Sequence, residues 1–197
     1  IIYCSGYYKM EQTKQLTEQT MTEESSSQES ESENPMRAVR IEKVVLSAGA
    51  TADSLEKARK LLDRISGMKA QIIASKKRIP AFAVNPGLEV GTRVTLRGEK
   101  AVELLRRLLG AVDNKIDESQ IEENHFSFGI KEYIEIPGME YQRDIGTRGF
   151  NATVVFARRG LRVKYKKIKS GKIPKKQYVT KEEIINFMEE NFNTQIT

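Results

Sequence analysis

Acidic side chains gather near the middle of the chain at spacings that could hold a divalent cation. They are Asp113, Asp117, Glu118, Glu122 and Glu123. Carboxylate oxygens suit Mg²⁺, which can assist phosphoryl transfer by neutralising charge on the reacting phosphate. The competing interpretation is a solvated helix end and loop, because no nearby residue types suggest a nucleophile. The cluster supports one enzyme hypothesis, a metal-dependent RNA-processing enzyme, without completing a catalytic site.

Other residue types that carry chemistry are scarce. His125 is the sole histidine, and a lone histidine beside strand phenylalanines is more often structural than an acid or base. Cys4 is the sole cysteine, so neither an intramolecular disulfide nor a cysteine-based zinc site can form. Gly49 follows a predicted strand without a glycine-rich phosphate motif around it, which indicates a turn. We therefore predict no enzyme, no catalytic residue, no metal and no cofactor.

Positive charge dominates the later part of the chain. Residues 145–181 contain twelve Lys or Arg and no Asp or Glu. Such a surface repels itself unless a polyanion lies against it, so we expect RNA or DNA as the partner. The alternative is a basic tail with no specific partner. The basic residues form three groups: Arg37, Arg40 and Lys43; Lys76, Lys77 and Arg78; and Arg158, Arg159, Arg162, Lys164, Lys166, Lys167, Lys169, Lys172, Lys175 and Lys176.

Length and charge predict one basic domain preceded by a polar tail. Residues 1–35 hold two lysines and seven glutamates, so the formal net charge of +6 leaves +11 for residues 36–197. The tail cannot bury enough apolar surface to offset its chain entropy, and we expect it to be disordered. Residues 36–197 are expected to form one RNA-binding domain. Met10, Met21 and Met36 are each candidate starts, so part of the tail need not be native.

The chain carries no sign of a membrane or an export route. No apolar run approaches the roughly 20 residues that a membrane helix needs, and the first residues lack the continuous apolar core of a secretion signal. A single cysteine fits a reducing compartment. We expect a cytoplasmic protein with no membrane partner.

Hydrophobic periodicity predicts short strands alternating with amphipathic helices in the first half. Strands are predicted over residues 40–47, 71–74 and 92–96. Asp53 is predicted to cap a helix that Gly67 ends, and Gly98 to open a second helix over residues 99–112. The inward residues of the first helix are predicted to be Leu55, Ala58, Leu61, Leu62 and Ile65. Those of the second are Val102, Leu105, Leu108, Leu109 and Val112, with Arg106 and Arg107 outward.

The second half predicts antiparallel strands and a last helix. Phe126, Phe128 and Ile130 alternate with small residues, as do Ala152, Val154 and Phe156. The alternation continues through Leu161, Val163 and Tyr165. Thr180 and Glu183 predict a capping box for a helix that buries Ile184, Phe187 and Met188. The predicted fold class is α+β, with helices on one face of a mainly antiparallel sheet.

The distribution of basic residues favours structured RNA over duplex DNA, since no predicted helix has a basic face suited to the major groove. An aromatic RNA-recognition platform on Phe126 and Phe128 is the nearest alternative. The segment lacks the three spaced aromatics of that motif, so we predict both side chains to be core.

Several segments in order resemble a known family. HFSFGIKEYIEIPGMEYQRDIGTRGFNATVVFAR is similar to the most distinctive stretch of the L5 family of large-subunit ribosomal proteins, in its archaeal form. NPMRAVRIEKVVLSAG, LLDRISGMKAQIIASKKRIPAF and VTLRGEKAVELLRRLL resemble preceding parts of that family, and YVTKEEIINFMEENF its carboxyl terminus. The resemblance covers about residues 34–193.

The resemblance implies a structural protein of the central protuberance that binds 5S rRNA and large-subunit rRNA. It also implies that the connection matching residues 75–90 points at the peptidyl-site tRNA, with Lys76, Lys77 and Arg78 on phosphates. The region matching residues 136–150 would bridge to small-subunit protein S13, and the bridge residues we assign are Glu140, Tyr141, Arg143 and Arg148. Other central-protuberance proteins would be neighbours.

Three polar positions of the family contact 5S rRNA, and the chain departs from two of them. The matching residues here are Ser47, Met68 and Thr95, and only Thr95 fits the family pattern of Asn, Gln and Thr. Serine still donates and accepts hydrogen bonds, whereas methionine has only a weak sulfur acceptor. We expect 5S binding to persist, with little dependence on Met68.

Overall fold

A six-stranded sheet organises the part of the chain that this computed structural model describes, residues 36–197. The predicted tail, residues 1–35, lies outside the described residues. The strands are β1 (Arg40–Gly49), β2 (Gln71–Ala74), β3 (Glu89–Leu96), β5 (Ile121–Glu122), β6 (His125–Ile130) and β7 (Phe150–Ala157). They lie in the order β2-β3-β1-β7-β6-β5, and every neighbouring pair is antiparallel. The prediction of an antiparallel sheet is confirmed.

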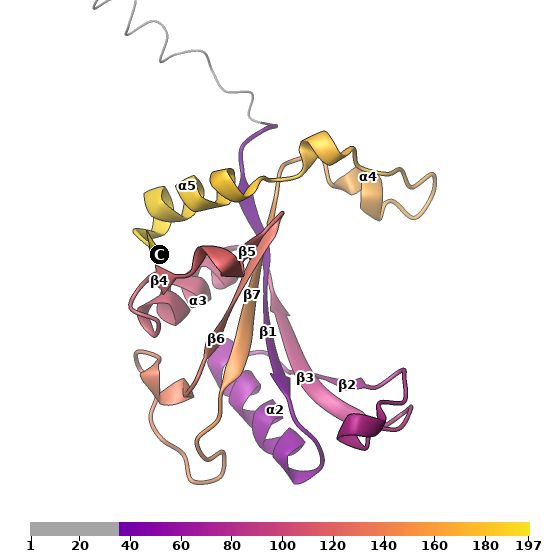
Figure 1. Cartoon of the computed structure of the whole chain (residues 1–197), viewed down its shortest axis with the longest axis vertical. Helices are drawn as coiled ribbons and strands as arrows, with labels where there is room; N and C mark the ends of the chain where they lie inside the picture. The colour runs from indigo at the N-terminus through magenta and orange to yellow at the C-terminus, as the bar shows by residue number, and fades with distance from the viewer. Residues whose placement is uncertain (1–35) are drawn as a thin grey trace, which may run out of the picture. The chain divides into compact units, whose positions relative to one another are not determined.

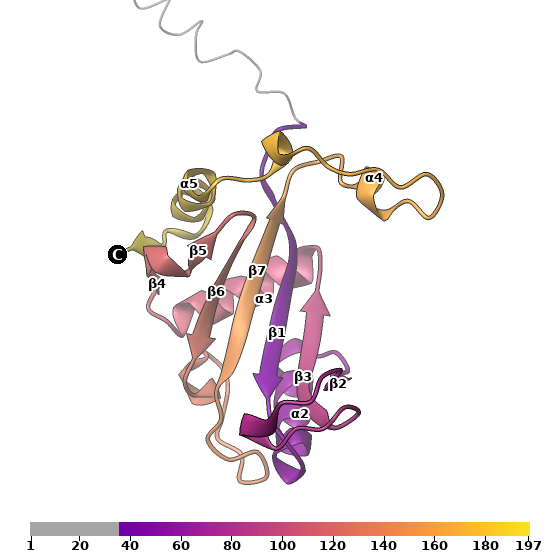
Figure 2. The ribbon, with the colours of Figure 1, turned by 45° about the vertical axis from the view of Figure 1, so that its right-hand side comes forward.

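Three helices cover one face of this sheet. They are α2 (Asp53–Ser66), α3 (Glu99–Gly110) and α5 (Lys181–Phe192), all on the same side of the strands in Figure 1. Figure 2 turns the other face towards the viewer, with α2 and α3 behind the strands. The α+β fold class with helices on one face is therefore confirmed.

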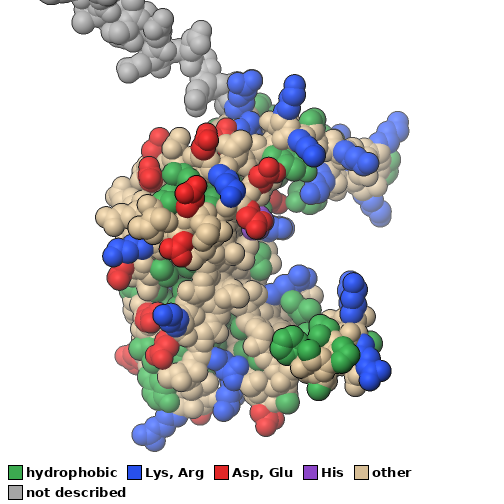
Figure 3. Space-filling model, in the orientation of Figure 1, with side chains coloured by type: hydrophobic (Ala, Val, Ile, Leu, Met, Phe, Trp, Pro, Cys, Tyr) green, Lys and Arg blue, Asp and Glu red, His purple; other side chains and the backbone are tan. Residues whose placement is uncertain are grey.

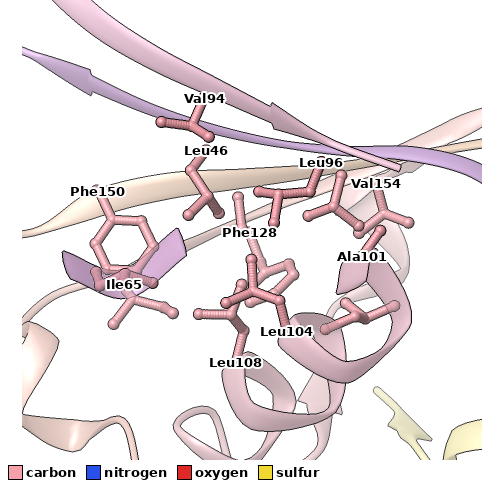
Figure 4. Close-up of a cluster of buried hydrophobic side chains, with 14 of the residues drawn as sticks. Leu46, Ile65, Val94, Leu96, Ala101, Leu104, Leu108, Phe128, Phe150 and Val154 are labelled. Atoms are coloured by element: carbon pink, nitrogen blue, oxygen red, sulfur yellow. The ribbon is translucent and has the colours of Figure 1, made fainter. Parts of the chain in front are cut away.

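The core forms because alternate strand residues turn towards the helices. Leu46 of β1, Phe128 of β6 and Val154 of β7 are at most 4% exposed and pack opposite α3. Figure 4 shows them pointing towards the α3 residues Ala101, Leu104 and Leu108. Each fully buried side chain of this size contributes about 1.5–3 kcal/mol through removal of apolar surface from water. Phe126 and Phe128 are buried, and their rings stack with centroids 5.8 Å apart. Their predicted core role is confirmed.

The helix ends match the sequence in three places and differ at the start of α2 and the end of α3. As predicted, Gly98 immediately precedes α3. Gly67 ends α2 in the left-handed conformation, and Thr180 and Glu183 form the predicted capping box of α5. The predicted Asp53 cap is wrong, because Asp53 is already helical and Ala52 precedes the helix without a side-chain cap. Ser54 takes over locally: its hydroxyl accepts from the Thr51 amide at 3.2 Å and donates to the Thr51 carbonyl at 2.6 Å.

Two further expectations are corrected. On α3 the buried residues are Ala101, Leu104, Leu105, Leu108 and Leu109, so the predicted Val102 is only half-buried and the helix ends before Val112. The strand predicted to continue through Leu161, Val163 and Tyr165 is instead the single helical turn α4 (Arg162–Tyr165). No neighbouring strand within residues 36–197 pairs with this segment, and alternation without a partner does not produce a sheet.

The remaining elements are short. A parallel pair, β4 (Lys115–Ile116) and β8 (Gln195–Ile196), joins the carboxyl terminus to the segment after α3, which two-residue patterns could not predict. Single 3₁₀ turns are η1 (Pro80–Phe82), η2 (Glu118–Gln120), η3 (Tyr133–Glu135) and η4 (Lys175–Gln177). Within residues 36–197 we find no helix that combines the length and apolar character needed to cross a membrane.

Ala52 and Gly98 give a matched pair for testing backbone strain. They precede α2 and α3 in almost the same conformation, at φ 49° and ψ −131° for Ala52 and φ 68° and ψ −148° for Gly98. Glycine adopts this region without cost, whereas alanine is strained there by about 1–3 kcal/mol. We expect Ala52→Gly to raise the free energy of unfolding by about 1 kcal/mol and Gly98→Ala to lower it by a similar amount.

Urea denaturation of both variants measures these changes. No atom outside its immediate neighbours lies within 4 Å of a Cβ added at Gly98, so the effect there reports conformation alone. Equal stability of wild type and both variants would contradict the strain at Ala52.

Candidate nucleic-acid interface

The sheet face without helices is polar. We call it the open face and define it by strand positions that alternate with the buried ones. On the register pairs, Ser47 of β1 lies opposite Arg93 and Asn151, while Thr153 of β7 lies opposite Val45 and Ser127. Arg93, Ser127 and Asn151 are exposed. Hydroxyls, an amide and a guanidinium therefore line a surface that a partner can reach.

The open face has no negative charge at its paired positions. None of the register pairs joining β1 to β3, β1 to β7 and β6 to β7 contains Asp or Glu. Figure 3 shows Lys and Arg gathered on two projections that border a hollow, while most Asp and Glu in that view lie over the helix side. The covered and uncovered sides of the sheet thus differ in charge.

The three polar positions predicted for 5S rRNA do not all lie on the open face. Thr95 is exposed on β3 and lies opposite Val45 of β1. Ser47 is half-buried and follows Val45 by two residues on β1, so it lies on the same face. Met68 lies in the turn between α2 and β2 and is 43% exposed. Its backbone amide donates a hydrogen bond to the Ser66 hydroxyl at 3.2 Å, and its carbonyl accepts one from the same hydroxyl at 3.1 Å. The structure brings Ser47 and Thr95 onto one surface and leaves Met68 at its edge.

Sequence reasoning missed Arg93, Ser127, Asn151 and Thr153 as candidate contacts. Ser127, Asn151 and Thr153 stand at the outward positions of strands whose inward positions the alternation had identified. Arg93 lies in a strand that was predicted without inward positions. The outward residues of the same strands were the available signal.

The connection between β2 and β3 forms the first projection, which we call the basic connection (residues 75–88). Lys76, Lys77 and Arg78 are exposed on it. The Ile79 and Val84 backbones pair across a tight turn, with amide-to-carbonyl distances of 2.9 and 3.1 Å. Phe82 stands at that turn with 77% of its surface exposed. An aromatic ring with no packing role therefore lies close in sequence to three cations.

Residues 158–178 form the second projection, which we call the basic arm. Every predicted cation from Arg159 to Lys176 is exposed. Within residues 36–197 the ion pairs are His125 with Glu122 and Arg158 with Glu183, so the exposed arm cations have no carboxylate partner there. Arg158 differs from them, since it is half-buried and its guanidinium donates to Glu183. Arg40 is exposed and Lys43 half-buried on β1, while Arg37 precedes the compact unit of residues 39–197.

The arm is joined to the sheet by a hydrogen bond. The Tyr165 hydroxyl donates to Oε1 of Glu42 at 3.0 Å, across 123 positions of sequence. This hydrogen bond, with burial and the negative charge of Glu42, raises the pKa of Tyr165 above its usual value, and Arg97 opposes the shift. A phenol with a raised pKa keeps its proton at neutral pH, and the hydrogen bond is lost as the pH rises through that pKa.

The segment predicted to form a bridge is anchored at its base. Tyr133 is buried, and its hydroxyl accepts a hydrogen bond from the backbone amide of Gln142 at 2.8 Å. Ile145 is also buried. Glu140, Tyr141 and Arg143 are exposed beyond these anchors, and Arg148 is half-buried. The segment holds charged and aromatic side chains outward on a fixed loop.

The carboxylates of the enzyme hypothesis do not converge. Within residues 36–197 no group of three or more His, Cys, Asp or Glu could hold a metal ion. Asp117 instead accepts hydrogen bonds from Gln120 at 2.9 Å and Thr197 at 3.4 Å. His125 lies near the Glu123 carbonyl at 3.1 Å and Glu122 at 3.5 Å.

Comparison with known proteins identifies the family. The family model described as ribosomal protein L5 matches residues 34–84, and the carboxyl-terminal model of the same family matches residues 89–187. The large ribosomal subunit protein uL5 of Nanoarchaeum equitans is 44% identical over 167 residues, which is 83% of this chain and 99% of that protein. This chain belongs to the ribosomal protein L5 family.

Other archaeal members agree over similar lengths. The uL5 protein of Sulfurisphaera tokodaii is 39% identical over 85% of this chain and 97% of its own length. That of Sulfolobus acidocaldarius is 38% identical over 87% of this chain and 98% of its own length. The resemblance to the L5 family in its archaeal form is confirmed. The two L5 models together cover residues 34–84 and 89–187, which include the basic arm and all of the basic connection except residues 85–88.

Tyr165 and Glu42 give a test of the arm's attachment. We expect Glu42→Ala to lower the pKa of Tyr165 towards its usual value, because the acceptor and its negative charge are both removed. NMR titration of ¹³C-tyrosine resonances measures the change. Glu56→Ala on α2 is the control and leaves the pKa of Tyr165 unchanged. An equal pKa in wild type and Glu42→Ala would contradict the hydrogen bond.

Proposed function

We propose that this chain is a structural, non-catalytic component of the large ribosomal subunit, and that residues 36–197 bind 5S rRNA and large-subunit rRNA. Its relatives are named large ribosomal subunit proteins, which supports the assignment to that subunit. The observation that carries the RNA-binding role is the open face, polar and without carboxylates at its register pairs, bordered by two basic projections.

The open face suits RNA for physical reasons. Hydroxyl and amide groups such as Ser47, Asn151 and Thr153 can donate to phosphates and exchange hydrogen bonds with 2′-hydroxyls. Cations on the bordering projections neutralise phosphates and release counterions, which dominates affinity. The rRNA contacts that we assign to the arm come from the exposed residues Arg159 to Lys176. Arg158 serves instead to hold the start of α5 through Glu183.

The 5S rRNA contact is assigned to Ser47 and Thr95, with Met68 at its border. Both polar residues lie on the open face beside Arg93, whose Nε donates to the Gln71 amide oxygen at 3.4 Å. That long hydrogen bond leaves most of the guanidinium donors available for phosphate. Arg93 therefore joins Thr95 as a proposed 5S contact.

The basic connection is assigned to the peptidyl-site tRNA. Lys76, Lys77 and Arg78 supply phosphate contacts, and the exposed ring of Phe82 supplies a surface on which a base can stack. The loop formed by residues 136–150 is assigned to the bridge with S13, through Glu140, Tyr141, Arg143 and Arg148. Its anchoring by Tyr133 fixes where those side chains lie. Remaining exposed surface is available to other central-protuberance proteins.

A metal-dependent RNA-processing enzyme is the second hypothesis carried from the sequence. No observation on the described residues favours it, since its five carboxylates form no group able to hold a metal ion. Asp117→Asn therefore should not alter the RNA-binding role.

Substitutions on the open face test the 5S contact. We expect Arg93→Ala to weaken 5S rRNA binding and to reduce the log–log salt slope by about 0.7–0.9, the effect of one lost phosphate contact. Thr95→Ala should cost about 0.5–1.5 kcal/mol, the usual net value of one hydrogen bond. Met68→Gln restores the amide typical of the family and should tighten binding. Filter binding across a KCl series measures all three.

Arg64 provides the matched control. It is an exposed arginine in the last turn of α2, on the covered side of the sheet. Arg64→Ala should leave the affinity and the salt slope nearly unchanged. If Arg64→Ala and Arg93→Ala weakened 5S binding equally, the open face would not be the interface.

Phe82→Ala tests the basic connection. Loss of one base stacked on an aromatic ring costs about 1–3 kcal/mol. We expect ribosomes with this variant to bind peptidyl-site tRNA more weakly, and those with Lys76, Lys77 and Arg78 all changed to alanine to show a smaller salt slope. Ile134→Ala, which shortens an exposed apolar side chain outside the assigned contacts, is the control for Phe82. Unchanged tRNA affinity in both connection variants would remove this assignment.

A further inference from the structure

A pocket lies where the basic arm meets the end of the sheet. Its volume is about 560 Å³, and its lining comes from β1, β7, Asn124 and residues 158–178 of the arm. Pockets that bind small molecules have volumes of roughly 300–1,000 Å³. The space is therefore large enough for a nucleotide and too small for a helical duplex. None of the RNA contacts proposed above uses it as a pocket.

Cations line this pocket from two sides. Lys43 comes from β1, and Lys164, Lys172 and Lys175 come from the arm. None of the four has a carboxylate partner within residues 36–197. Lys166, Lys167 and Lys169 belong to the same arm but are not part of the lining. A phosphate group at the mouth of the pocket would thus meet four unpaired ammonium groups.

Two phenol rings also line it. Tyr165 is 60% exposed and Tyr178 is 39% exposed, although both lie beside the apolar end of β7. Neither ring takes part in an aromatic contact with another ring of residues 36–197. Exposed tyrosine faces in a basic hollow are the surfaces on which unpaired RNA bases stack.

One carboxylate stands among these cations. Oε1 of Glu42 accepts from the Tyr165 hydroxyl at 3.0 Å, and within residues 36–197 the Glu42 carboxylate has no other hydrogen bond or ion pair. Its second oxygen is free to accept from an N–H donor. Adenine, cytosine and guanine carry an exocyclic amino group, whereas uracil does not. Glu42 would therefore favour an amino-bearing base and repel an additional phosphate at that point.

We propose that this pocket receives a single unpaired nucleotide of RNA, with its base stacked on the tyrosines, its amino group on Glu42 and its phosphates on the lysines. The inference rests on the RNA-binding function proposed above and adds to it a site that reads an extruded base. Three kinds of contact meet in one hollow, whereas the outer lysines of the arm offer charge alone. The arm is then a reader of unpaired nucleotides as well as a neutraliser of phosphate.

Defined RNA hairpins test this site. The full chain is titrated with a fully paired hairpin and with the same hairpin carrying a single bulged A or a single bulged U, by fluorescence anisotropy at one KCl concentration. We expect the bulged A to bind about tenfold tighter than the paired hairpin, since one stacked base is sufficient for that ratio. The affinity for the hairpin with a bulged U should lie between these two, because uracil has no amino group to donate to Glu42.

Matched variants separate the contacts. Tyr165→Leu and Tyr178→Leu should each reduce the ratio between bulged and paired hairpins, and Glu42→Gln should remove the preference of A over U. Lys172→Ala should reduce the ratio, whereas Lys169→Ala, outside the pocket, should weaken all hairpins equally and leave the ratio unchanged.

The outcomes distinguish this proposal from the function on which it rests. Equal binding of bulged and paired hairpins by wild type, with salt-dependent affinity retained, would overturn the pocket and leave rRNA binding in place. Absence of salt-dependent RNA binding would overturn the proposed function itself. AMP is titrated as a separate probe, and AMP binding without a preference for bulged hairpins would assign the pocket to a free nucleotide and refute an RNA site.

Discussion

Apolar contact between the helices and the inner sheet face decides which side of the sheet remains available to a partner. Leu46, Phe128 and Val154 turn inward because Ala101, Leu104 and Leu108 of α3 meet them. In a strand, the next residue must point the other way. Ser47, Ser127 and Thr153 are thus outward as a direct result of the core. A one-residue slip in register would exchange the two sets and remove both the core and the polar surface.

Charge follows the same division. The register pairs that join β3, β1, β7 and β6 to one another have no carboxylate, and the basic projections lie at the border of the uncovered side. The projections carry cations with no ion-pair partners within the described residues, so nothing there competes with a polyanion. Arg158, at the start of the arm, is the exception, because its guanidinium pairs with Glu183, which also belongs to the capping box of α5. Stability and binding therefore use different arginines of one cluster.

The sequence predicted the sheet, the three long helices and the family, because strong periodicity and glycine or threonine ends specify them locally. The inward residues of α2 were all correct, since a 14-residue helix fixes its own phase. The strand predicted through Leu161, Val163 and Tyr165 was wrong, because alternation indicates strand propensity but not the presence of a partner strand. The β4–β8 pair depends on a contact between residues 80 positions apart, which no local pattern records.

The candidate interface was predictable only in part. Its basic residues are visible in the sequence because they form runs, whereas Arg93, Asn151 and Thr153 belong to separate strands. They meet only through the register of β1 with β3 and β7. Glu42 and Tyr165, 123 positions apart, form the wall of a pocket for the same reason. Long-range pairing creates such sites, and composition does not reveal it.

The central position of β1 has a consequence for synthesis and folding. β1 pairs on one side with β7, and Val44 and Val154 are 110 positions apart. Until β7 has been made, β1 therefore has an unpaired edge, which in any chain is a template for intermolecular pairing. Sheet closure across such a distance also makes folding slow, because the entropy of a long loop is lost before the contacts form. The interval between the translation of β1 and that of β7 is thus the period when this chain most needs protection from aggregation.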